Sequence, residues 1–116
     1  MNADRFTVKS QEALQAALSL AARSRNPQAL PEHLLGALLE QEGGIVTPVL
    51  RNAGVDDVAV RQANNGAIGA LPTLAAGGEA SQSGSELIQA LQRAEALMAE
   101  MNDEYVSTEH LLLALA

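Results

Sequence analysis

The sequence predicts an all-α fold, a pseudo-twofold helical bundle built from a duplicated unit. Residues 7–39 align without a gap with residues 84–116, and 12 of these 33 pairs are identical. The apolar share of the chain is 47%, supplied mainly by Ala, Leu and Val, which favours close helix packing over a sheet sandwich. Repeated units of this size usually pack on each other and bury a shared apolar face. A binding module is therefore the leading interpretation.

The first helix is predicted after Thr7, whose hydroxyl can accept a hydrogen bond from an unpaired backbone amide at the helix start. The Asn26–Pro27 pair is expected to end it. Its apolar residues recur at i, i+3, i+4 and i+7 and share one face: Leu14, Ala17, Leu18 and Ala21.

Three further helices are predicted in the first unit. Pro31 suits a first helical turn because it has no amide hydrogen to leave unpaired, and this helix runs to about Gln41. A short helix follows at residues 45–53, with Gly54 as its C-terminal cap. A fourth begins near Asp56, and the helical pattern dissolves from Gly66 onward.

The chain is thus divided into a first repeat at residues 1–70, a linker at 71–84 and a second repeat at 85–116. The linker is rich in Gly and Ser and carries Pro72. The second repeat contains a helix that starts at Gly84 or Ser85 and a helix capped by Ser107.

The second repeat is expected to be truncated, because the first copy has two more helices after the matched region. Without such helices the apolar side chains of Leu111, Leu112 and Leu115 would lack a covering layer. Exposed apolar patches promote association. We therefore expect a chain that dimerises, by exchange of helices for example, or that is less stable than a complete pair of repeats.

Charge and composition exclude several classes of function. The formal charge of −7 opposes binding to nucleic acid, whose phosphates attract basic side chains. The chain has no cysteine, so disulfides and thiolate metal sites are not available. No apolar run approaches the ~20 residues that span a bilayer, and the N-terminus lacks the order of a secretion signal. We expect a cytoplasmic protein with no membrane partner.

The duplicated pairs Glu32–His33 and Glu109–His110 are the candidates for chemistry. Adjacent helical residues point about 100° apart, so one pair does not chelate one ion readily, and the Glu-to-His spacing of three that helix metal sites use is missing. The simpler interpretation is that each His anchors a helix start by hydrogen bonding to the preceding loop. A metal protein or helical enzyme built around His33 and His110 stays open as an alternative.

No catalytic, cofactor or metal residue is predicted. The chain has no Gly-x-x-x-x-Gly-Lys-Ser/Thr phosphate loop and no Gly-x-Ser-x-Gly nucleophile context. We therefore expect no enzyme activity in these residues, and no bound ATP.

Several segments in order resemble the Clp amino-terminal repeat family. They are Pro31–Leu39, Glu42–Leu50, Ala53–Val55 and Asp103–Leu112. Within that family they are most similar to the N domains of Hsp100 disaggregases of the ClpB type. The resemblance covers nearly the whole chain and is weakest from residue 64 to residue 83.

The resemblance implies a domain of two four-helix repeats, joined to hexameric AAA+ ATPase rings that bind ATP and work with the DnaK system. The implied task of the domain is to catch exposed apolar segments of unfolded or aggregated proteins during the stress response. The family's substrate-contact residues match Thr7, Asp103 and Glu109, and Leu91 is an apolar neighbour. Thr7 and Glu109 can equally be a helix cap and a partner of the helix dipole.

A second implied function is that of a ClpC- or ClpA-type N domain, which docks adaptor proteins or, in ClpC, phosphorylated arginine. Glu32 and Glu109, at repeat-related helix starts, would then face the guanidinium group.

Overall fold

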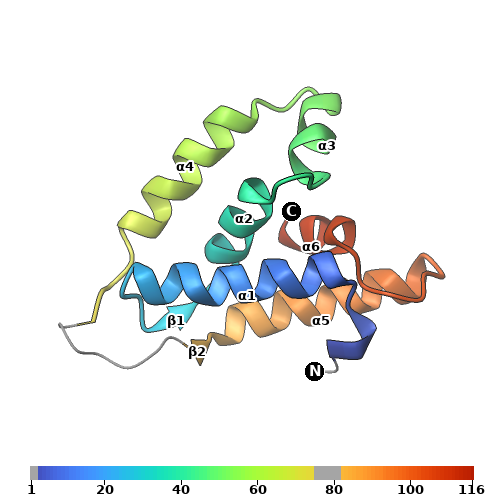
Figure 1. The fold of residues 1–116 in the computed structure, drawn as a ribbon, viewed down its shortest axis with the longest axis horizontal. Helices are drawn as coiled ribbons and strands as arrows, with labels where there is room; N and C mark the ends of the chain where they lie inside the picture. Colours follow the sequence, from blue (N-terminus) through green and yellow to red (C-terminus); the bar gives the residue numbers. More distant parts are fainter. Residues whose placement is uncertain (1–2, 75–81) are drawn as a thin grey trace.

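The computed structural model describes residues 3–74 and 82–116 and confirms the predicted all-α class. Within those residues it contains six α-helices, a short 3₁₀ helix and two very short strands (Figure 1). The elements are η1 (Ala3–Arg5), α1 (Val8–Arg23), β1 (Gln28–Ala29), α2 (Pro31–Glu40), α3 (Val46–Asn52), α4 (Asp57–Gly69), β2 (Gln82–Ser83), α5 (Ser85–Glu100) and α6 (Thr108–Leu115). None of these helices combines the length and the apolar character that a membrane span needs.

Most helix starts are where the capping residues predict them. The Thr7 side chain accepts a hydrogen bond from the Ser10 amide, and Asp56 accepts from the amides of Val58 and Ala59. Pro31 is the first residue of α2, and Ser107 caps α6. These predictions are confirmed because capping depends on neighbouring residues alone.

The two longest helices end in the same way, and this ending was not predicted. Arg25 and Asn102, which lie 77 positions apart, both have a φ of 58° in the left-handed region. In each case the next residue's amide donates back into the last turn, from Asn26 to the Ala21 carbonyl and from Asp103 to Met98, both at 3.0 Å. The turn after Arg23 therefore ends α1 before the Asn26–Pro27 pair is reached.

The helix α4 is longer than predicted, since it ends at Gly69 rather than at Gly66. A Cβ added at Gly66 or Gly69 would meet nothing within 4 Å, so both glycines lie at open positions. Ile68 is half-buried, and its Cδ1 lies 3.8 Å from the Cβ position of Gly36 on α2. Packing on α2 therefore keeps the chain helical beyond Gly66, although a glycine weakens a helix locally.

Two parallel pairings join the repeats, and neither was expected from the sequence. The strand β1 pairs with β2, so that Ala29 faces Ser83, and Phe6 pairs with Val106. These pairings are related by the repeat, because Ser83 lies 77 positions after Phe6 and Val106 lies 77 positions after Ala29. Within the predicted linker at 71–84, the last three residues pair with the first repeat, and residues 75–81 lie outside the described residues.

One apolar core is shared by both repeats. Its largest fully buried side chains include Leu34 and Leu38 from α2, Leu87 from α5 and Leu111 from α6. α2 lies between α1 and α4, and it also contacts α5 and α6 (Figure 1). The expectation that Leu111 lacks a cover is wrong, since it is 0% exposed, and Leu112 and Leu115 are half-buried. The exposed apolar side chain of α6 is Leu113, at 51%.

Candidate functional site

The two histidines form matching caps at the starts of α2 and α6. Nδ1 of His33 accepts from the Leu30 amide at 2.9 Å, and Nδ1 of His110 accepts from the Ser107 amide at 2.8 Å. Nδ1 is occupied as an acceptor, so the proton of each neutral ring lies on Nε2. This confirms that each His anchors a helix start to the preceding loop.

The Nε2 atoms reach repeat-related partners that differ in charge. His33 Nε2 is 2.8 Å from Asn26 Oδ1, and the side-chain nitrogen of Asn26, Nδ2, donates to the Pro72 carbonyl at 3.0 Å. His110 Nε2 is 2.8 Å from Asp103 Oδ2. Burial lowers the pKa of His33 below its ordinary value, and the nearby Glu32 carboxylate opposes this shift. Both nitrogens of both rings are thus engaged within the protein, and the described residues contain no group of three or more metal-ligating side chains.

A corner of the molecule brings together three of the four predicted contact residues. Thr7 donates its amide to the Val106 carbonyl at 3.0 Å, which fixes the start of α1 beside the segment between α5 and α6. Asp103 lies three positions before Val106 and Glu109 three positions after it, and both are exposed. We call this region the acidic corner. It contains a hollow of about 330 Å³ lined by Asp103, Glu104, Tyr105, Ser107, Glu109 and His110.

Apolar surface is also exposed at the acidic corner. The Tyr105 side chain is 53% exposed, and Val8, which directly follows Thr7, is 70% exposed. The fourth predicted residue, Leu91, belongs elsewhere: it is 3% exposed and packs in the core. Its position on the buried face of α5 leaves it no surface to offer a ligand in this conformation.

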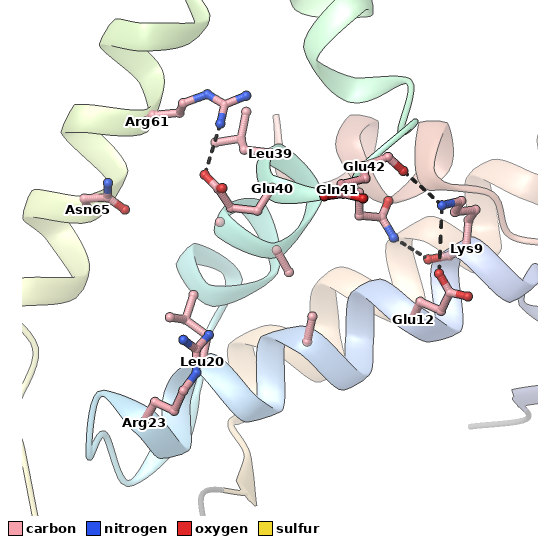
Figure 2. Close-up of a pocket in the computed structure, with 13 residues that line it drawn as sticks. Lys9, Glu12, Leu20, Arg23, Leu39, Glu40, Gln41, Glu42, Arg61 and Asn65 are labelled. Atoms are coloured by element: carbon pink, nitrogen blue, oxygen red, sulfur yellow. Dashed lines mark hydrogen bonds and ion pairs between the residues drawn. The ribbon is translucent and has the colours of Figure 1, made fainter.

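A second hollow is a groove that the sequence did not predict. It lies between α1 and α4 over α2, has a volume of about 530 Å³, and is shown in Figure 2. Small and apolar residues form part of its lining: Ala16, Leu20, Gly36, Ala37 and Leu39. Charged and polar residues line the rest: Lys9, Glu12, Arg23, Glu40, Gln41, Glu42, Arg61 and Asn65. We call this the α1–α2–α4 groove.

Hydrogen bonds hold one end of the groove together. Gln41 Nε2 donates to the Lys9 carbonyl at 2.9 Å, and Lys9 Nζ donates to the Glu42 carbonyl at 3.2 Å (Figure 2). At the side formed by α4, Arg61 pairs with Glu40 at 3.0 Å. No sequence motif marks this groove, because three helices that are distant in the chain supply its lining. The sequence signal for it was the spacing of four residues along one face of α1: Glu12, Ala16, Leu20 and Arg23.

Comparisons with known proteins agree with this architecture. A model of the Clp repeat (R) N-terminal domain matches residues 5–116. The chaperone protein ClpB of Corynebacterium diphtheriae is 45% identical over 111 residues, which cover 95% of this chain. The chain spans only 13% of the length of that relative.

Solved structures show the same fold. The Hsp104 N-terminal domain from Candida albicans matches with a TM-score of 0.85 and 24% identity, covering 95% of this chain and 72% of that one. A ClpV N domain in complex with a VipB peptide matches with a TM-score of 0.80 and 25% identity, covering 96% of this chain and 67% of that one.

Proposed function

Because the chain belongs to the Clp repeat N-terminal domain family, we propose that it captures exposed apolar segments of unfolded or aggregated polypeptides for a ClpB-like disaggregase. The observation that carries the proposal is the acidic corner, where exposed apolar side chains stand among carboxylates. Tyr105 and Val8 offer apolar contact, while Asp103 and Glu109 favour basic residues that flank an apolar segment. Such a surface binds many sequences weakly, since it makes few directional demands.

The wider role follows from the relatives and belongs to the proposal. Captured segments would pass to hexameric AAA+ rings that bind ATP, in cooperation with the DnaK system. The 116 residues contain no phosphate-binding loop, so we assign them binding and no hydrolysis. The solved complex of a ClpV N domain with a VipB peptide supports a peptide-binding role for a domain of this fold.

An NMR titration tests the proposal directly. A permanently unfolded, reduced and alkylated protein is added to the labelled domain, and amide signals are followed. We expect shifts at Thr7, Asp103, Tyr105 and Glu109 that saturate with concentration. Shifts confined to residues 71–84 and the chain ends would count against the acidic corner.

Two substitutions separate the charge of the acidic corner from its structure. Asp103→Asn keeps an oxygen acceptor for His110 Nε2, as Asn26 does for His33. Glu109→Gln changes an exposed side chain. We expect each to weaken binding of an apolar peptide with flanking lysines about two- to fivefold, because exposed ion pairs contribute ~0.2–1 kcal/mol. Glu100→Gln, an exposed carboxylate at the end of α5, is the matched control and should leave the affinity unchanged.

A further inference from the structure

We propose that the α1–α2–α4 groove docks an amphipathic helical segment in one orientation, with the segment's N-terminal end at Gln41 and its C-terminal end at Arg23. The inference rests on the proposed function, because it names a class of captured segment that the acidic corner does not select. Its evidence is the backbone of the groove, one unpaired buried oxygen and the charges at the two ends.

The backbone around the groove selects a helix over an extended peptide. Its walls and floor are α-helices, whose backbone groups are paired within each helix. An extended peptide gains affinity by pairing with a free strand edge, and neither β1 nor β2 lines this groove. An extended segment would leave its own amides and carbonyls unpaired against the apolar lining residues, which is costly. A helical segment satisfies these groups internally.

The Gln41 end suits the N-terminus of such a helix. The hydrogen bond from Nε2 to the Lys9 carbonyl fixes the orientation of the Gln41 amide. Its Oε1 is buried and has no hydrogen-bond partner among the described residues. The first four amides of a helix are unpaired and carry partial positive charge, so they can supply the missing donor after a small shift of this side chain. The carboxylates of Glu12 and Glu42 lie at the same end, where the Lys9 ammonium group is 3.9 Å from Glu12, so these three side chains carry one net negative charge (Figure 2).

The opposite end suits a helix C-terminus and an acidic side chain. The guanidinium group of Arg23 is exposed and makes no ion pair or hydrogen bond with any described residue. Figure 2 shows it beside Leu20 at the edge of the groove. Eleven positions separate Glu12 from Arg23 on α1, about 16 Å at 1.5 Å per residue. The occupant is therefore a segment of about three helical turns with an apolar stripe, a basic residue in its first turn and an acidic residue in its last.

Two peptides of identical composition test the orientation. One carries Lys in its first turn and Glu in its last, and the other has the two exchanged. Both are covalently stapled, so that they are equally helical. Fluorescence anisotropy should show that the protein binds the first peptide about two- to fivefold more tightly, and that high salt reduces this preference.

The variant Arg23→Glu should reverse the preference between the two peptides. The peptides have the same net charge, so a general change in protein charge affects both alike. Arg23→Gln should remove the contribution of the Arg23 end to this preference, and the preference should not reverse. The control Gln92→Glu, at an exposed position of α5 outside the groove, should keep the original preference.

Two results would overturn the inference: an unchanged preference in folded Arg23→Glu protein, or no saturable binding of either peptide to the wild-type protein. The unfolded model protein is titrated in parallel. If it binds while the stapled peptides do not, the groove inference fails and the proposed function stands. If the stapled peptides bind with the expected preference while the unfolded protein does not, the proposed function fails instead.

Discussion

At the scale of single residues, the same histidine cap is found in two different environments. An imidazole caps α2 and another caps α6 with the same hydrogen bond to the backbone. The partner of Nε2 is a buried asparagine in the first repeat and an exposed aspartate in the second. The buried pair joins α2 to the end of α1, whereas the exposed pair adds a carboxylate to the acidic corner. Duplication has therefore kept the cap and changed what surrounds it.

The lowered pKa of His33 predicts a loss of stability on mild acidification. The unfolded chain takes up a proton on this side chain near pH 6.5, while the folded protein does so only at lower pH. The free energy of unfolding should therefore fall as pH drops below about 6.5, until the folded-state pKa is reached. Urea unfolding of the wild-type protein at pH 7.5 and 5.5 measures this slope.

The variant His33→Asn is the comparison for that slope. It keeps an acceptor near the Leu30 amide, loses the contact with Asn26 and cannot titrate. We expect a cost of about 1–3 kcal/mol at pH 7.5, from a buried polar group left unpaired. Its stability should vary less with pH than that of the wild type, and His110 is present in both proteins. Equal slopes would show that His33 does not carry the effect.

At the scale of helices, an ion-pair cluster positions α4 relative to α2 and α3. Asp57 accepts from Arg51 at 3.0 Å and lies 3.5 Å from Arg61. Arg61 also donates to Thr47 on α3 at 2.8 Å and pairs with Glu40 on α2. Gly36 lets α4 come close, since a Cβ there would lie 3.3 Å from Asn64 Nδ2. These contacts set the width of the α1–α2–α4 groove.

Replacing Asp57 by Asn tests the cluster by its pH dependence. Hydrogen bonds from Arg51 lower the pKa of Asp57, burial opposes this, and the positive charge of Arg61 adds to the lowering. A lowered carboxylate pKa contributes stability above the unfolded value of 3.8 and loses it as pH falls through the folded value. Asp57→Asn should thus unfold at lower urea than the wild type at pH 7, and the gap should be smaller at pH 3, which lies below the unfolded value of 3.8. A gap of equal size at both pH values would contradict this account.

At the scale of the whole molecule, the two repeats are joined by backbone pairings and by one shared core. The pairings of Phe6 with Val106 and of β1 with β2 cross between the repeats in both directions. Residues of α1, α2, α5 and α6 contribute to the same core. Neither repeat buries its apolar face alone, so we expect a single unfolding transition.

Overpacking of repeat-related alanines tests this cooperativity. Ala17 on α1 and Ala94 on α5 are 77 positions apart, and both are 0% exposed. Ala17→Leu and Ala94→Leu should each cost about 1–3 kcal/mol, because the added carbon atoms have no room. Urea unfolding followed by circular dichroism should show each variant with one transition shifted to lower urea. Two separate transitions would mean that the repeats unfold independently.

Local features of this protein were predictable from the sequence. Apolar spacing indicated the helices, and Thr7, Pro31, Asp56 and Ser107 indicated where four of them begin, since a cap depends on a few neighbouring residues. The internal repeat indicated a duplicated bundle, and the family resemblance is confirmed. Thr7, Asp103 and Glu109 were grouped only through that resemblance, and their role in binding stays a prediction.

Tertiary structure decided what depends on contacts between distant segments. It placed Leu91 in the core and the Asp103 carboxylate on His110, extended α4 to Gly69, and paired residues 82–84 with the first repeat. It also formed the α1–α2–α4 groove from three helices. Helix periodicity reports which face of a helix is apolar, and it contains no information about which other helix covers that face. The sequence by itself therefore determined the helices and their duplication, and packing alone determined which surfaces remain free to bind.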